Sequence, residues 1–192
     1  MNHVIIGAGI AGVTAAQAIK ETDEDADVVI IGKEEAAPYK RYLLTEFLFD
    51  SIDKAALVFA PVESLKDMGI KLRRGQSARA INSTEKWVQL DNDDVLYYDR
   101  LLIATGGQPN LGHTLRPFLK QIQRYYTLKD VVLLKKKIDS IRKCIVFGEG
   151  LSCLDLLAGL HNLGKDVTYI TKRERVEVPQ ADSAFNNNLQ EF

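Results

Sequence analysis

The stretch Val4-Ile5-Ile6-Gly7-Ala8-Gly9-Ile10-Ala11-Gly12 decides the fold, because an apolar strand pattern runs directly into glycines spaced as G-x-G-x-x-G. The residues around it predict a strand over 3–7, an Ala-rich helix over 10–19 and a second strand over 27–31. A strand–helix–strand unit with this glycine spacing is typical of dinucleotide binding. The amino-terminal part therefore predicts an α/β fold with a nucleotide site at the first strand–helix turn.

Each glycine of this loop has its own expected role. Gly7 permits the tight turn, Gly9 lets the backbone approach a pyrophosphate, and Gly12 lets the helix pack close to the strand. The first helical amides, at Ile10 and Ala11, and the helix dipole would stabilise the phosphates. The alternative is a tight turn with no ligand.

A carboxylate is expected about twenty residues after the glycines, where it accepts hydrogen bonds from the adenosine ribose. Glu34 or Glu35 has that spacing, and we favour Glu34. Lys33, directly before it, is included among the candidate cofactor-binding residues, although a solvated surface position suits it equally. In the alternative interpretation Glu34 is also a surface residue.

A weaker copy of the motif begins at residue 146. Val146-Phe147-Gly148-Glu149-Gly150-Leu151 aligns with Ile5 to Ile10 and is followed by a predicted helix over 151–163 and a strand over 167–171. Gly148, Gly150 and Leu151 are the candidate phosphate-facing residues. Cys153 stands where the third glycine is expected, and Glu149 adds an unfavourable charge, so a purely structural unit is the alternative.

The end of this second unit bears on nucleotide choice. Lys172 and Arg173 follow the strand where an acid would indicate NADH, and cations there can hold a ribose 2′-phosphate. The sequence therefore leans towards NADPH. The alternative is a solvated turn.

Between the two units the pattern predicts three strands joined by polar turns. They cover residues 71–81, 86–90 and 95–98 and form an antiparallel meander. The apolar run 101–104 is expected at the centre of the parallel sheet. The cluster Gly106, Gly107, Pro109 and Gly112 marks the predicted domain boundary.

The composition limits the kinds of partner that we expect for this chain. The 25 basic and 26 acidic residues nearly balance, and we expect neither a nucleic acid nor a membrane as partner. Two cysteines, Cys144 and Cys153, suit reduced thiols in a cytoplasmic protein better than a disulfide framework. We expect no metal site.

Three further segments extend the pattern along the chain. Residues 38–45 read PYKRYLLT, residues 98–106 read YDRLLIATG and residues 126–130 read YTLKD. Together with the two glycine motifs they resemble the FAD-dependent pyridine-nucleotide oxidoreductases, in the branch of ferredoxin reductases, rubredoxin reductases and nitrite reductase FAD domains. The ordered motifs make coincidence a poor explanation.

The resemblance implies a Rossmann-like FAD-binding domain with an antiparallel β-meander at residues 1–109. The first half of a second Rossmann-like domain, which binds NAD(P)H, would follow at residues 110–192. It implies FAD and NADP or NAD as cofactors.

It also implies positions for individual residues. Arg41 would lie near the FAD phosphates or flavin, the Ala78 backbone would pass the adenine, and Ala104, Thr105 and Gly106 would pack against the cofactor. The alternatives are a surface cation for Arg41 and a simple strand end for Thr105.

The chain departs from this family's pattern near the flavin. Glu46 stands where a lysine is usual, and Asp155 stands where a glutamate is usual. Two acids in place of a basic–acidic pair would repel each other. No catalytic residue is assigned, and Glu46 and Asp155 are the candidates near the flavin.

No cysteine lies between Met1 and Lys143, so disulfide chemistry at the flavin is excluded. The expected function is an FAD-dependent NAD(P)H oxidoreductase whose acceptor is an iron–sulfur or rubredoxin-type protein, oxygen, a quinone or an attached domain. Family members are longer and often dimerise through a carboxyl-terminal domain. We therefore expect a fragment, inactive alone, that forms homo-oligomers. The alternative is a non-catalytic nucleotide-binding or structural fragment of a flavoprotein.

Overall fold

The computed structural model describes residues 1–109, 115–172 and 181–188. The chain splits into two compact units, each described by itself: Met1–Arg41 with Lys54–Leu119, and Tyr42–Asp53 with Lys120–Phe192. These units differ from the division at residues 109/110, because the segment 42–53 groups with the later part of the chain. The division into an FAD-binding and an NAD(P)H-binding domain stays a prediction.

A four-stranded parallel sheet in the order β3-β2-β1-β7 forms the centre of the first unit. Its strands are β1 (Asn2–Ile6), β2 (Asp27–Gly32), β3 (Ile70–Arg74) and β7 (Arg100–Ile103). In β1, Ile5 pairs with Ile30 of β2 and Leu102 of β7. The predicted strand–helix–strand unit is confirmed, and its apolar strands are those of a sheet buried on both faces.

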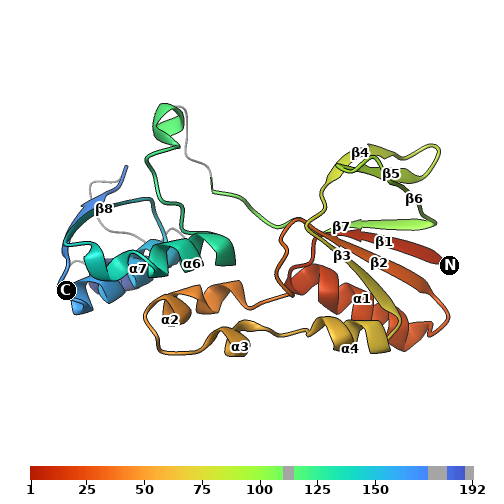
Figure 1. Ribbon diagram of the computed structural model, residues 1–192, viewed down its shortest axis with the longest axis horizontal. Helices are drawn as coiled ribbons and strands as arrows, with labels where there is room; N and C mark the ends of the chain where they lie inside the picture. The colour runs from red at the N-terminus through yellow and green to blue at the C-terminus, as the bar shows by residue number, and fades with distance from the viewer. Residues whose placement is uncertain (110–114, 173–180, 189–192) are drawn as a thin grey trace. The chain divides into compact units, whose positions relative to one another are not determined.

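Helices cover one face of this sheet (Figure 1). They are α1 (Ile10–Thr22) and α4 (Val62–Asp67), and the short α3 (Lys54–Leu57) precedes α4. The core on this side includes Ile5, Val13, Ile30 and Leu65, each at most 1% exposed. Gly69, with φ +72°, follows α4, and a glycine in this conformation is a common helix end.

An antiparallel sheet covers the opposite face (Figure 1). Its strands are β4 (Ala78–Asn82), β5 (Trp87–Leu90) and β6 (Val95–Tyr97), in the order β4-β5-β6. Val88 and Leu90 pack with Val4 and Ile31 in the core between the two sheets. The predicted meander is therefore confirmed, although its first strand begins later than expected.

One strand assignment and the expected position of another strand were wrong. Residues 71–81 form two strands, because Gly75 has φ +69° and turns the chain between β3, which joins the parallel sheet, and β4. The run 101–104 is not central in the described sheet, since β7 pairs only with β1 there and Ile103 is 61% exposed. Strand propensity alone carries no information about which sheet a strand joins.

The second unit contains a parallel pair of strands, β8 (Lys143–Phe147) and β9 (Asp166–Ile170), connected by α7 (Leu151–Asn162). The short helix α2 (Leu44–Leu48) packs with α6 (Leu128–Lys135) and with α7. A capping box starts α6, in which Asp130 N–H donates to Thr127 Oγ1 and Thr127 N–H donates to Asp130 Oδ2.

Shorter elements complete the described chain. They are the 3₁₀ turns Arg41–Leu43, Arg116–Phe118 and Ile138–Ser140, and helix α8 (Ser183–Asn188). Helix α6 stops at Lys135, and the 3₁₀ turn Ile138–Ser140 lies beyond it. No helix among the described residues is long and apolar enough to cross a membrane.

Lys135 explains how residues 42–53 join the second unit. Its Nζ donates to the carbonyl oxygens of Phe47 (2.8 Å) and Leu48 (3.1 Å) at the end of α2, and pairs with Asp50 (2.6 Å). Lys135 is therefore half-buried, whereas Lys136 and Lys137 are exposed. Phe49 lies against Gly159 of α7, where a Cβ would overlap its ring.

Candidate functional site

The first glycine loop joins β1 to α1 and is closed on two sides. Gly7 has φ +122°, its N–H donates to Ile31 O (2.8 Å), and a Cβ here would overlap the carbonyl of Ala104. A Cβ at Gly12 would overlap the carbonyl of Gly7. These two glycines are therefore required by close backbone packing.

Gly9 differs from both, because nothing lies within 4 Å of a Cβ built on it. It is the N-cap of α1 at φ −81°, with no side-chain cap, and Ile10 and Ala11 behind it are exposed. The first amides of the helix thus face open space, which is the geometry that accepts a phosphate. The loop fits the pyrophosphate of a dinucleotide.

Glu34 lies just beyond the end of β2 and is held by two side chains. Tyr39 donates its hydroxyl to Glu34 Oε2 (2.9 Å), and Arg41 Nη2 pairs with Glu34 Oε1 (2.6 Å). The guanidinium of Arg41 also lies 5.2 Å from the centre of the Tyr39 ring. Glu34 is thus a positioned carboxylate, 29% exposed, rather than a freely solvated one.

The other acid in this turn is placed differently. The Glu35 carboxylate lies against Gly75, and its carbonyl accepts from Arg74 Nη1 (2.9 Å). Lys33 is exposed. Of the two acids, Glu34 is therefore the one whose carboxylate is oriented by neighbouring side chains.

The segment before β4 lies beside the end of β2, since Gln76 N–H donates to Gly32 O (3.1 Å) and Gly75 N–H donates to Glu34 O (3.3 Å). Ala78 starts β4 directly afterwards. Gln76 Oε1 is buried and has no hydrogen-bond partner in the described part of the chain. These contacts place the start of β4 beside the end of β2.

The end of β7 lies against the same loop. Ala104 N–H donates to Ile6 O (2.8 Å). A Cβ built on Gly7 would also lie close to the Thr105 amide nitrogen. Thr105 and Gly106 are exposed, with Gly106 at φ +67°. The structure therefore brings together Gly7, Ala104 and Thr105 from distant parts of the sequence.

A group of polar side chains gathers in the second unit around Tyr125. Its hydroxyl lies 2.6 Å from Thr45 Oγ1. Burial raises the pKa of Tyr125, the bond to Thr45 opposes this, and the charges of Asp155 and Glu46 raise the pKa further. Glu46 Oε2 is buried without a hydrogen-bond partner among the described residues. The two candidate acids thus act on one phenol.

The second glycine loop is anchored to β9 and has a different backbone from the first. Gly148 has φ +150° and Gly150 has φ +91°, and nothing lies within 4 Å of a Cβ at Gly150. Cys153 Sγ lies 2.7 Å from where a Gly148 Cβ would be, so the absent Cβ leaves room for the thiol. Burial, with Glu149 adding, raises the pKa of Cys153.

Glu149 reaches from this loop to the end of β9. Its Oε1 accepts from Lys172 N–H (3.2 Å) and lies 3.5 Å from Thr171 Oγ1. The Leu151 side chain, next along the loop, is 56% exposed. Arg173 falls outside the described residues.

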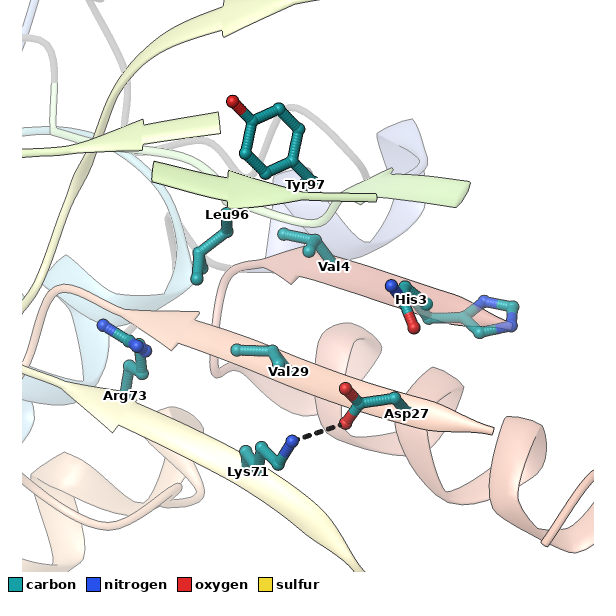
Figure 2. A pocket seen from close by; sticks show the side chains of 9 residues that line it. His3, Val4, Asp27, Val29, Lys71, Arg73, Leu96 and Tyr97 are labelled. Atoms are coloured by element: carbon teal, nitrogen blue, oxygen red, sulfur yellow. Dashed lines mark hydrogen bonds and ion pairs between the residues drawn. The ribbon is translucent and has the colours of Figure 1, made fainter. Parts of the chain in front are cut away.

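A pocket of about 190 Å³ lies elsewhere in the first unit, between the sheet and β6 (Figure 2). Its lining includes Asn2, Asp27 and Lys71 near the amino-terminal ends of the parallel strands, where Lys71 pairs with Asp27 at 2.8 Å. Ligands of open α/β sheets bind at the carboxyl ends instead. This pocket is therefore not the candidate nucleotide site.

Sequence patterns did not assign Tyr39, Tyr125 and Gln76 to the sites. Tyr39 lies within the segment 38–45, so its proximity to Glu34 was a weak available signal. Tyr125 and Gln76 depend on contacts made by the folded chain. No group of His, Cys, Asp and Glu among the described residues is suited to a metal ion.

Residues 1–192 match the family described as pyridine nucleotide-disulphide oxidoreductase. The ferredoxin–NAD(+) reductase component of a 3-phenylpropionate/cinnamic acid dioxygenase from Photorhabdus laumondii is 30% identical over 173 residues, 90% of this chain and 44% of that protein. The corresponding component of the anthranilate 1,2-dioxygenase system of Burkholderia cepacia is 30% identical over 192 residues, covering 97% of this chain and 47% of that protein.

Among solved structures, the putidaredoxin reductase–putidaredoxin complex has a TM-score of 0.88 at 25% identity, covering 99% of this chain and 47% of that one. The chain thus spans less than half the length of these proteins.

Proposed function

The chain belongs to the pyridine nucleotide-disulphide oxidoreductase family, and on that basis we propose that it forms part of an FAD-dependent NAD(P)H oxidoreductase. Bound FAD would supply the redox chemistry, taking a hydride from the nicotinamide and releasing its electrons to an acceptor. The residues of this chain bind and orient the two nucleotides.

The observation that carries the proposal is the contrast among the three glycines of the first loop. Gly7 and Gly12 are needed for packing, whereas Gly9 leaves its approach open. A loop that served only as a tight turn would need Gly7 and Gly12 for packing, but it would not need an open approach at Gly9. The open approach supports a pyrophosphate at the amides behind Gly9.

The remaining contacts of FAD follow from the same unit. Glu34 would accept hydrogen bonds from the ribose hydroxyls, since Tyr39 and Arg41 leave it further acceptor capacity. The Ala78 backbone would line the adenine. Thr105 and Gly106, exposed beside the loop, would pack against the cofactor.

In the second unit, Gly148, Gly150 and Leu151 would hold the pyrophosphate of the reduced nicotinamide nucleotide. Glu46 and Asp155 would lie near the flavin, as the resemblance implies. These two acids replace the basic–acidic pair of the family pattern, and the charges of both raise the pKa of the buried Tyr125.

We infer that the electron acceptor is an iron–sulfur or rubredoxin-type protein or a small molecule. No cysteine precedes Cys144, so a redox disulfide beside the flavin is not available. The two dioxygenase relatives are ferredoxin reductase components by name, which supports an iron–sulfur acceptor for this chain. Protein partners beyond the acceptor, including a second copy of the chain, belong to the same proposal.

Because the chain alone is expected to be inactive, the experiment uses the full-length protein that contains it and follows oxidation of NADH and NADPH, with ferricyanide as artificial acceptor, with and without added FAD. The proposal expects turnover that depends on FAD. Nucleotide binding without turnover would favour the non-catalytic alternative, which the substitution of Glu46 for the usual lysine supports. Absence of both binding and turnover would overturn the proposal.

A further inference from the structure

Glu149 lies in the second glycine loop, but its carboxylate is directed to another part of the site. Oε1 accepts from the N–H of Lys172 and is within 3.5 Å of Thr171 Oγ1. Both partners lie directly after β9. From its position in the sequence, the charge of Glu149 would lie among the phosphates. In the fold it lies at the carboxyl end of β9.

The loop that carries Glu149 is fixed on the same strand. Gly148 N–H donates to Ile170 O (3.3 Å), and Tyr169 donates its hydroxyl to Gly148 O (2.9 Å). Together with the contacts of Glu149, these bonds attach the Gly148 N–H, the Gly148 carbonyl and the Glu149 carboxylate to β9 and its end. Glu149 is exposed, and its two contacts direct the carboxylate towards the end of β9.

In a strand–helix–strand nucleotide site, the end of the second strand lies beside the adenosine ribose, and an acid there accepts the ribose hydroxyls. The first unit supplies such an acid after its second strand, at Glu34. The second unit has Thr171 and Lys172 at the corresponding place. Glu149 brings a carboxylate to that place from the loop.

We propose that Glu149 determines nucleotide specificity, selecting NADH and rejecting NADPH. This inference rests on the proposed function, because it assumes that the second loop binds a reduced nicotinamide nucleotide. A carboxylate at this point accepts the 2′- and 3′-hydroxyls of NADH. It repels the 2′-phosphate of NADPH, which carries a like charge.

Lys172 does not reverse this preference. Its backbone N–H donates to Glu149, and no hydrogen bond or ion pair with a described residue fixes its exposed ammonium at the end of β9, whereas two contacts direct Glu149 there. A 2′-phosphate near Lys172 would also lie near the Glu149 carboxylate. The preference for NADPH that the basic pair suggests in the sequence is therefore opposed by the contacts of Glu149.

The test measures dissociation constants of NADH and NADPH by calorimetric titration of the FAD-loaded protein. Unmodified protein should bind NADH at least about tenfold more tightly than NADPH. Glu149→Gln removes the charge and keeps the size, and should shift the ratio of the two constants towards NADPH by about tenfold, on the scale expected for one charge pair near a protein surface. Adenosine 5′-diphosphate and adenosine 2′,5′-diphosphate should show the same shift.

Asp166→Asn is the matched control, because Asp166 lies at the opposite end of β9 and pairs with Lys143. It should leave the ratio unchanged. An unmodified protein that prefers NADPH, or a ratio that Glu149→Gln and Asp166→Asn change equally, would overturn the inference while leaving nucleotide binding intact. Failure to bind either nucleotide would overturn the proposed function and this inference with it.

Discussion

Gly9→Ala should separate cofactor binding from folding. The backbone at Gly9 has φ −81°, which alanine adopts readily, and nothing lies within 4 Å of the added methyl group. The expected cost in the free energy of unfolding is at most about 1 kcal/mol, the loss associated with alanine at a helix N-cap. The protein should therefore fold normally.

The same methyl group would stand where the pyrophosphate approaches the first amides of α1. Hydrogen bonds to charged groups are each worth about 1.5–3 kcal/mol, and displacing the phosphates should remove at least one of them fully and weaken a second. The expected loss is about 3 kcal/mol, which is more than a hundredfold in the dissociation constant of FAD.

Gly12→Ala is the contrasting variant. Its methyl group would overlap the Gly7 carbonyl and contact the Ile5 side chain, so it should destabilise the fold by about 2–3 kcal/mol or more. Urea unfolding and FAD fluorescence titration measure the two effects. If Gly9→Ala binds FAD as tightly as the unmodified protein, or unfolds as readily as Gly12→Ala, the reasoning about this loop is wrong.

The remaining predictions concern particular contacts. Lys135→Met should lower the free energy of unfolding of the second unit by about 2 kcal/mol through the lost carbonyl hydrogen bonds, whereas Lys136→Met should change it by less than about 0.5 kcal/mol in the same urea experiment. Tyr125 has a raised pKa in the fold, so its neutral form contributes stability that is present below pH 10.0 and is lost as pH rises through the folded pKa; unfolding titrations should show a smaller alkaline loss for Tyr125→Phe. Arg41→Met should weaken FAD binding about tenfold by releasing Glu34, and an unchanged titration would remove Arg41 from the site.

The sequence predicted the fold correctly where the local hydrophobic pattern and the packing of the folded chain favour the same element. Apolar strands next to glycines predicted both strand–helix–strand units, and the polar turns predicted the meander. The single strand expected over 71–81 failed because the positive φ of Gly75 turns the chain into a second sheet. Neighbours in sequence with similar propensities can belong to different sheets, and only tertiary packing decides between them.

The residues of the candidate site also divide into those that local spacing predicts and those that only the folded chain brings together. The placement of the first-loop glycines at the turn and of Glu34 after β2 was predictable, since it depends on spacing within one unit, and their roles towards a cofactor stay a prediction. Glu149 was interpreted by its position in the loop, where its charge is unfavourable, but side-chain reach moves that charge to the end of β9. The contact between Tyr125 and Thr45 joins residues 80 positions apart, so no local pattern predicts it.

The central claim is that this chain holds FAD in its first glycine loop and passes it electrons from a reduced nicotinamide nucleotide. The direct measurement is the visible absorption spectrum of the full-length protein that contains this chain, reconstituted with FAD and mixed anaerobically with NADH. The account predicts a bound flavin whose absorption bleaches on mixing, with slower bleaching by NADPH. A correctly folded protein that stays colourless with excess FAD, or whose bound flavin is reduced by neither nucleotide, would contradict it.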